Sequence, residues 1–585
     1  MKYSHLNNVY FIYATKKVID SVLLAIFMTM NIERIDDLPL IHSQFNSDNL
    51  IALFNTHFPD HGNWLGISGG HLLIGWLLYI MSESDHRLSH VEDWASQRMD
   101  VLSQLLGVSD LRLINFNDDR LANLLDRLAD DNSWKEFEKS LSKDMLQLYK
   151  LPDIPVIRTD SFNVPQYRQP GNLFRLGYSK QNRSDMPFAK VMMSMLDEGM
   201  LPLSVDIIKG NSGDVDHYLP TIERTYDLFS GEGNLYVGDS QLGSLSNRSS
   251  IAAKGHYYLM PLNRKHCVES KRISYINELK VPYTSLPSVY GDEESGRKKA
   301  YYFEVQEVNL VDKAGYTWYE RRILVYSPDY AQGLLDSLEK RVEKSKEAIR
   351  QLVIPKSGRK KIVSLGDIQS RVDVILKKNK VVGLLNINYQ EKKTETPKQR
   401  YKDKPARVEV SYEYGLNVER DELAIATLRK QTGWQIYGTN IPKQKMTSEM
   451  VVLKYRDQYK IEHLFDYMLH RDVGLLPIFL HKEERIKGLI RLLTIAMRFV
   501  LRIQYQIRAQ LKEDADVLKE VYPGNPGRAT NQPTTPMILK VFKGVSMVIE
   551  NGHKKMPPLS GIQQRILRLL KVKDCYQAIL ELSDS

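Results

Sequence analysis

The stretches Pro155-Val-Ile-Arg-Thr-Asp160 and Asn234-Leu-Tyr-Val-Gly-Asp239 decide the fold. Each is a short run of mainly apolar residues that ends in aspartate, the pattern of a buried strand that delivers its last side chain to the edge of a sheet. Two aspartates placed in this way could share a divalent cation. The pair therefore predicts an α/β core with a candidate metal site at Asp160 and Asp239.

A third acidic residue, Glu462, lies in the stretch Tyr455-Arg-Asp-Gln-Tyr-Lys-Ile-Glu-His-Leu-Phe465. Aromatic and apolar residues recur around it at helical spacing, which predicts a helix that carries the carboxylate on a half-buried face. Mg²⁺ prefers carboxylate oxygens, and two such ions roughly 3.5–4 Å apart can hold the attacking and leaving oxygens of a phosphodiester. Asp160, Asp239 and Glu462 are thus the candidate catalytic and metal-binding residues.

These motifs, in this order, resemble the DDE-type transposases of bacterial insertion sequences, in the cut-and-paste group with a Tyr-Arg-Glu-Lys signature. Four further motifs carry the resemblance: Gly-Tyr-Ser-Lys at 177–180, Ile-Lys-Gly-Asn-Ser-Gly-Asp at 208–214, Gly-Asp-Ser at 238–240 and Gly-Thr-Asn at 438–440. The resemblance covers most of the chain. It implies a ribonuclease-H-like mixed-sheet core and two Mg²⁺ ions in each active site, with Mn²⁺ as a substitute.

The chain departs from the signature at two of its four positions. The signature places Tyr, Arg, Glu and Lys where this sequence has Tyr455, Gln458, Glu462 and Leu469. In the family the tyrosine contacts DNA near the cut and the basic pair is thought to hold DNA phosphates there. The resemblance therefore implies DNA-binding roles for Tyr455 and Gln458, and the nearby basic residues that could substitute are Arg456, His470 and Arg471.

Composition narrows the class of protein only modestly. The net charge of +10 over 585 residues is a mild tilt towards a polyanionic partner. The two cysteines, Cys267 and Cys575, fit a reducing compartment and give no case for structural zinc. Apolar stretches such as residues 72–81 are about half the length that a bilayer crossing needs. We expect a cytoplasmic protein with no membrane partner. The resemblance implies a bacterial protein that is associated with the nucleoid when it is bound to DNA.

Helical periodicity dominates residues 1–148, for example in the leucines that follow Asn117-Asp118-Asp119, which can cap a helix. The resemblance implies that this helical domain binds transposon ends. The residues alone are equally compatible with a dimerisation bundle, because they contain no clear helix-turn-helix with a basic recognition helix.

After residue 148, we expect two segments of the α/β core, separated by an insertion and followed by a C-terminal appendage. Strand and helix patterns over 149–270 predict the first part of the core, and 222 residues then separate Asp239 from Glu462, too many for one connection. We expect a mainly β insertion over 271–422, whose basic piece includes Lys360 and Lys361 and is either a phosphate-binding surface or a solvated face. The second part of the core should span 423–515, and residues 516–585 should form a linker and a small helical appendage.

Several residues have plainer interpretations. Asp206 lies within a predicted strand, Asp214 and Asp216 precede a helix and resemble caps, and His217 and His463 are ordinary polar residues. Ser68, in a Gly-x-Ser-x-Gly pattern, lacks the preceding strand of a hydrolase elbow and is predicted to cap a helix.

The resemblance implies a DNA transposase that binds terminal inverted repeats as a homodimer in the synaptic complex, cuts the ends and joins the 3′-hydroxyls to target DNA. Two alternatives remain. One is a nuclease on the same core that cannot join strands. The other is a DNA-binding descendant that no longer cuts DNA. Gln458 and Leu469, which replace the Arg and Lys of the signature, are compatible with this alternative.

Overall fold

The computed structural model describes residues 30–46, 49–177, 185–229, 231–289, 299–354, 364–400, 403, 405–471, 473–550, 553–572 and 575–581. The chain folds into two compact units. The first unit contains the chain up to Tyr258 and again from Asp457 onward, and the second unit contains Leu259–Arg456.

The first unit begins with a helical region. Its helices are α2 (Leu38–Asn46), α3 (Leu50–His57), α4 (Gly69–Glu83), α5 (Val91–Ser96), α6 (Met99–Leu106), α7 (Asp118–Leu128) and α8 (Asp131–Leu146). The Asn117 side chain caps α7 by accepting a hydrogen bond from the Arg120 N–H at 3.0 Å, and the leucines that follow are buried, as predicted. Ser68 caps α4 by accepting from the His71 N–H, which confirms its predicted role.

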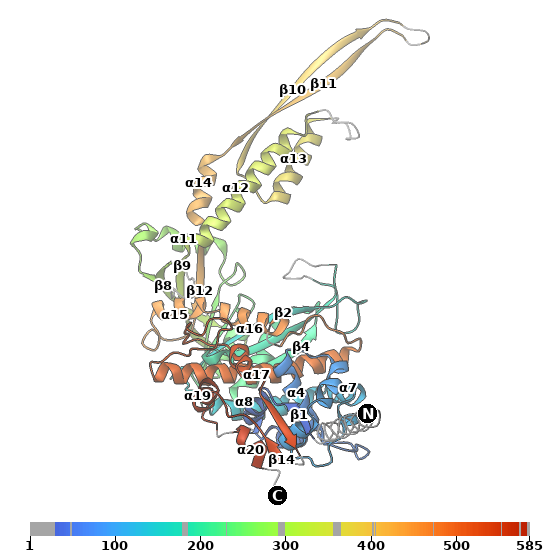
Figure 1. The fold of residues 1–585 in the computed structure, drawn as a ribbon. Helices are drawn as coiled ribbons and strands as arrows, with labels where there is room; N and C mark the ends of the chain where they lie inside the picture. The colour runs from blue at the N-terminus through green and yellow to red at the C-terminus, as the bar shows by residue number, and fades with distance from the viewer. Residues whose placement is uncertain are drawn as a thin grey trace, which may run out of the picture. The chain divides into compact units, whose positions relative to one another are not determined.

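A mixed sheet follows, built from β2 (Val156–Pro165), β3 (Phe188–Leu196), β4 (Pro202–Lys209) and β5 (Leu235–Gly238) in the order β4-β3-β2-β5. The first three strands form an antiparallel meander, and β5 then lies parallel to β2. Helix α9 (Val215–Tyr226) packs against β3 and β4, while α16 (Tyr459–His470) packs against β2 and α17 (Glu483–Glu513) against β4 (Figure 1). The predicted strand and helix order of this region is confirmed.

The two ends of the chain meet in the first unit. Strand β1 (Met30–Arg34) pairs antiparallel with β13 (Ser546–Glu550), which in turn pairs with β14 (His553–Lys555). Helices α18 (Thr535–Lys540), α19 (Gly561–Leu569) and α20 (Cys575–Glu581) complete this segment. The expectation that both terminal segments are purely helical was therefore wrong, because each supplies a strand whose partner lies at the other end of the chain.

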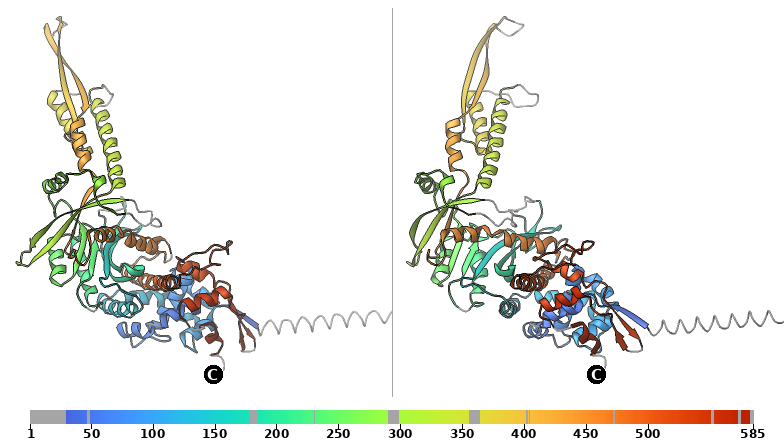
Figure 2. Two further views of the ribbon diagram at one scale, coloured as in Figure 1. Left: turned by 90° about the vertical axis from the view of Figure 1, so that its left-hand side faces the viewer. Right: turned by 60° about the vertical axis from the view of Figure 1, so that its left-hand side comes forward.

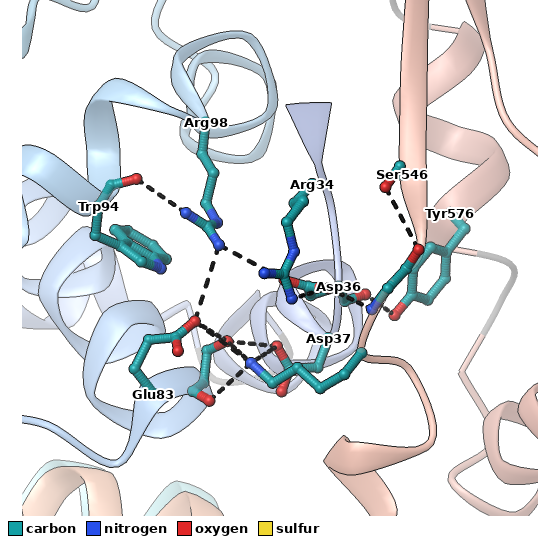
Figure 3. A network of polar contacts seen from close by, with 11 residues as sticks. Arg34, Asp36, Asp37, Glu83, Trp94, Arg98, Ser546 and Tyr576 are labelled. Carbon is teal, nitrogen blue, oxygen red and sulfur yellow. Dashed lines mark hydrogen bonds and ion pairs between the residues drawn. The ribbon is translucent and has the colours of Figure 1, made fainter. Parts of the chain in front are cut away.

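A buried polar network joins these ends (Figure 3). The Tyr576 hydroxyl donates to the Asp36 carbonyl at 2.7 Å, and the Gly544 N–H donates to the Asp36 carboxylate at 2.7 Å. Asp37 is fully buried, accepts from the Ser82 hydroxyl at 2.6 Å and lies 3.5 Å from the Lys543 ammonium. The chain end is thus fixed to the N-terminal helices by charged as well as apolar contacts.

The strands of the second unit follow one another in the order β6-β12-β9-β8-β7. They are β6 (Tyr257–Pro261), at which the chain enters the unit, β7 (Ser288–Val289), β8 (Ala300–Val311), β9 (Thr317–Tyr326) and β12 (Trp434–Thr439). The pairs β6–β12, β12–β9, β9–β8 and β8–β7 are antiparallel. The Gly-Thr-Asn motif at 438–440 begins inside β12, because Gly438 and Thr439 both belong to the strand.

The remaining part of the second unit combines helices with a long β-hairpin. Helices α12 (Pro328–Arg350), α13 (Leu365–Asn379) and α14 (Glu422–Gln431) share one apolar core with the base of the hairpin formed by β10 (Leu385–Lys398) and β11 (Arg407–Arg420). Away from its base the hairpin is exposed, and both views of Figure 2 show it extending past these helices. The described part of the insertion is therefore a mixture of strands and helices.

Three helices remain: α10 (Leu245–Ala253), α11 (Glu269–Asn277) and α15 (Ser448–Arg456). Among the described helices none is both long and apolar enough to span a bilayer.

Candidate active site

Asp160 and Asp239 lie on the neighbouring strands β2 and β5, Asp160 within β2 and Asp239 directly after β5. The predicted strand end at Asp160 was wrong, because β2 stays paired with β3 as far as Pro165. Parallel strands β2 and β5 pair in a register that ends with Arg158 opposite Val237 and Thr159 opposite Gly238, so the next pair in line is Asp160 and Asp239. Neighbouring strands lie about 4.8 Å apart. The structure therefore brings the two predicted aspartates together, and both side chains are half-buried.

A buried tyrosine connects α9 to this pair. The Tyr218 hydroxyl donates a hydrogen bond to Asp239 Oδ1 at 2.7 Å, and the Gln241 N–H donates to the same oxygen at 2.8 Å. Burial raises the pKa of Tyr218 well above its usual value, and the negative charges of Asp160 and Asp239 raise it further. Tyr218 consequently remains a neutral donor that fixes the orientation of the Asp239 carboxylate.

Two contacts fasten α16 to the face of β2 that carries Asp160. Near the start of the helix, Arg158 Nη1 lies 3.5 Å from Gln458 Oε1, and further along the rings of Phe162 and Phe465 lie 4.5 Å apart. Asp160 is midway between the two strand residues, and Glu462 is about midway between the two helix residues. With rises of about 3.3 Å per strand residue and 1.5 Å per helix residue, Glu462 lies roughly level with Asp160 along β2.

The helix around Glu462 differs from the prediction in two ways. It breaks at Asp457–Gln458 into α15 and α16, so Tyr455 and Glu462 do not belong to one helix. Glu462 is also exposed, because it lies at the margin of the buried face of α16, next to Phe465 and Leu469. Within the described parts of the chain, no three acidic, histidine or cysteine side chains come close enough together to ligate one ion.

The aspartate pair nevertheless has the chemistry of a hard-cation site. The described residues that donate to Asp239 are both neutral, the Tyr218 hydroxyl and the Gln241 amide. Asp239 lies beside a second carboxylate and has neutral donors among the described residues, a setting that favours a bound cation, and oxygen ligands suit Mg²⁺. Asp160 and Asp239 therefore fit a divalent ion, to which Glu462 could add an oxygen from α16.

The residues predicted to bind DNA fall into separate places. Tyr455 packs on Tyr437 with ring centroids 4.4 Å apart, and Arg456 Nη1 donates to the Ser327 hydroxyl at 3.2 Å. The Gln458 side chain contacts Arg158 instead of pointing freely outward.

Two further candidates lie at the far end of α16, and two cannot be placed. His470 and Arg471 line a cavity of about 900 Å³ in the first unit, and Arg471 pairs with Asp466 at 2.7 Å. Lys360, Lys361 and most of the motif at 177–180 lie outside the described residues.

Sequence reasoning misjudged Asp214. It occupies the N-cap position of α9, but its side chain makes no capping hydrogen bond. Its oxygens accept instead from the Ser161 hydroxyl at 2.9 Å and the Lys190 ammonium at 2.7 Å. Asp216 lies in the first turn of α9 and is not the cap, so that prediction was also wrong. Tyr218 was missed as well, and its only sequence signal was an aromatic residue in the motif-rich region before Asp239.

Removing the Tyr218 hydroxyl tests the link between α9 and the aspartates. We expect Tyr218→Phe to lower the affinity for a divalent cation by about 10- to 100-fold, the usual effect of losing a partner that orients a metal ligand. The thermal midpoint of the protein without metal should stay close to the wild-type value. Titrations of the variant and the wild type with Mg²⁺, followed by calorimetry, measure the shift, and an unchanged titration would show that Tyr218 serves packing alone.

Comparisons with known proteins identify the family of the chain. The model of the family described as Transposase DDE domain matches residues 152–499, more than half of the 585-residue chain. A Domain of unknown function (DUF4277) matches residues 30–140. No curated protein gives a match.

Among solved structures, the piggyBac transposase synaptic complex with hairpin DNA, determined by cryo-EM, matches at 11% identity and a TM-score of 0.26, over 60% of this chain and 75% of that one. A TM-score this low does not establish a common fold. The family match includes both aspartates, β2, β5 and the Glu462 helix. The chain belongs to the transposase DDE domain family.

Proposed function

We propose that this transposase binds the terminal inverted repeats of an insertion sequence, cleaves the DNA ends by metal-dependent hydrolysis and joins the freed 3′-hydroxyls to target DNA. The observation that supports the proposal is the register of β2 and β5, in which Thr159, the residue before Asp160, lies opposite Gly238, the residue before Asp239. We also propose that the chain is a member of the Tyr-Arg-Glu-Lys group and that its core is ribonuclease-H-like. The strand, hairpin, helix and strand order of β2 to β5 supports it.

In the proposed site, Asp160, Asp239 and Glu462 would hold two Mg²⁺ ions, or Mn²⁺ in their place. When bound, these ions supply activation of the attacking water and stabilisation of the departing 3′-oxygen. Tyr218 orients Asp239 from α9, and the Arg158–Gln458 and Phe162–Phe465 contacts hold α16 beside β2.

DNA recognition is assigned to other parts of the chain. We propose end binding by the helical region up to residue 148, and contacts near the cut by Tyr455, Arg456, Gln458, His470 and Arg471. Lys360 and Lys361 belong to the basic part of the proposed insertion, which spans residues 271–422. The proposed insertion separates two core segments, 149–270 and 423–515, and an appendage over 516–585 follows. Two ends must be cut together, so a homodimeric synapse is proposed, acting in the bacterial cytoplasm on nucleoid DNA.

Cleavage of a labelled duplex that carries the inverted repeats flanking the gene tests this proposal. Wild-type protein should cut at the repeat boundary with Mg²⁺ or Mn²⁺, stop cutting in EDTA, and transfer the labelled strand to a target plasmid. Cleavage without strand transfer would instead identify a nuclease. A shifted duplex with no cleavage in either metal would identify a DNA-binding descendant and contradict the proposal.

A further inference from the structure

A cavity of about 530 Å³ opens beside Asp239 on the α9 side of the sheet. Its lining comes from β2, β3, the loop at 210–214 and the residues after β5, and includes Asn163, Lys190, Asp214 and Gln241. Side chains alternate between the two faces of a strand, so Asn163 lies on the opposite face of β2 from Asp160. The cavity therefore adjoins the proposed metal site without being part of the face covered by α16.

Asn163 lines this cavity with a buried amide group that is not hydrogen-bonded within the described structure. Its side chain is only 3% exposed, and neither its amide nitrogen nor its amide oxygen has a hydrogen-bond partner within the described structure. Leaving a buried amide unsatisfied costs about 1–3 kcal/mol. A ligand that enters the cavity and forms hydrogen bonds with the Asn163 amide would explain why this amide lacks a partner within the protein.

Lys190 lies directly opposite Asn163 in the β2–β3 ladder, so the two side chains are neighbours on one face. Its ammonium donates to Asp214 Oδ1 at 2.7 Å and to the Ser212 carbonyl at 2.6 Å. The side chains of Lys190 and Asp214 are each 12% exposed. An ammonium has three donors, so one remains for a ligand.

We propose that Asn163 and Lys190 form a binding subsite for a DNA backbone phosphate next to the one that is cut. This inference rests on the proposed function and adds a site to it. Amide and ammonium hydrogens are the donors that phosphate oxygens accept. At the Asn163–Lys190 end of the cavity a metal ion is the wrong occupant, because the Lys190 ammonium already lies at the Asp214 and Ser212 oxygens that would ligate it there. Asp239, the other carboxylate of the lining, belongs to the proposed metal site.

The charge contribution of Lys190 is tested through the salt dependence of DNA binding. Each phosphate contact contributes about 0.9 to the slope of log affinity against log salt concentration for duplex DNA. In EDTA, we expect Lys190→Met to reduce this slope by about one and to weaken binding to the inverted-repeat duplex about tenfold near physiological salt. Lys150→Met is the matched control, because Lys150 is 80% exposed and pairs with Glu513 away from the cavity.

Asn163→Leu separates binding from stability. Replacing an unsatisfied buried amide by an apolar side chain of similar size should leave the thermal midpoint unchanged or raised. The same variant should bind DNA about tenfold more weakly in EDTA, as expected for losing a hydrogen bond to a charged group. A fall in thermal midpoint with unchanged affinity would overturn the subsite and give Asn163 a structural role.

The two proposals fail in different ways. If the wild type cuts and joins DNA but neither variant changes the affinity or the salt slope, the subsite is wrong and the transposase function stands. If the wild type binds DNA without cutting it and Lys190→Met still reduces the slope, the subsite stands and the cleavage function is wrong. A Lys190→Met/Asp214→Asn double variant shows whether any loss of binding arises from the unpaired Asp214 carboxylate instead of the missing phosphate contact.

Discussion

Asp239→Asn should lower Mg²⁺-dependent cleavage of the inverted-repeat duplex by at least about 10³-fold, because the variant removes one of two adjacent carboxylates while keeping the shape of the side chain. A loss of that size corresponds to about 4 kcal/mol of transition-state stabilisation, within the range expected for disrupting a catalytic metal site. The amide oxygen can still accept from the Tyr218 hydroxyl, so the local fold should persist. Single-turnover cleavage rates measure the loss.

The matched control for this variant is Asp216→Asn. Asp216 is exposed in the first turn of α9 and lies outside the proposed site. Its replacement should leave cleavage near the wild-type rate, and both variants should shift the duplex on a gel in EDTA as the wild type does. Near-normal cleavage by Asp239→Asn would remove Asp239 from the metal site, and loss of DNA binding together with cleavage would point to misfolding.

Asp37→Asn should stabilise the first unit at neutral pH. Burial raises the pKa of Asp37 from 3.8 to about 6, although Lys543 and the Ser82 hydroxyl partly offset the effect. Because the folded-state pKa lies above the unfolded value, protonation of Asp37 stabilises the fold fully below about pH 4, and this contribution is lost as the pH rises through about 6. A shift of about two units corresponds to about 3 kcal/mol.

The asparagine side chain mimics the protonated form at every pH, so this part of the pH dependence should disappear. We expect the variant to exceed the wild type by about 1–3 kcal/mol in unfolding free energy at pH 7.5 and to match it near pH 4. Urea titrations at the two pH values give the difference. Asp153→Asn, at an exposed loop position, should show no such change, and an Asp37→Asn protein that is less stable at pH 7.5 would mean that the Lys543 contact outweighs burial.

The sequence was informative where local pattern determines structure. The end of β5 could be located because its apolar run stops just before Asp239. The end of β2 could not, because this strand continues past Asp160 to Pro165. The register carries Asp160 towards Asp239 because Thr159 lies opposite Gly238 at the end of β5.

The features that were missed depend on partners far away in the chain. The break between α15 and α16 is invisible in a helical pattern that continues through Asp457 and Gln458. Asp214 has the sequence context of a cap, but Lys190 and Ser161 are the partners of its side chain. The pairing of β1 with β13 joins strands about 500 residues apart, and no local propensity specifies such a partner.

The interruption of the first unit by Leu259–Arg456 has a consequence for when the protein becomes active. Ribosomes add about 5–20 residues each second, so roughly 10–40 s pass between synthesis of Tyr258 and of Asp457. During that interval the nascent chain contains both aspartates but not the helix that carries Glu462. Strand β13, the partner of β1, emerges later still. Under the proposed triad, DNA cutting should begin only after translation is nearly complete, and prematurely terminated chains should be unable to break DNA.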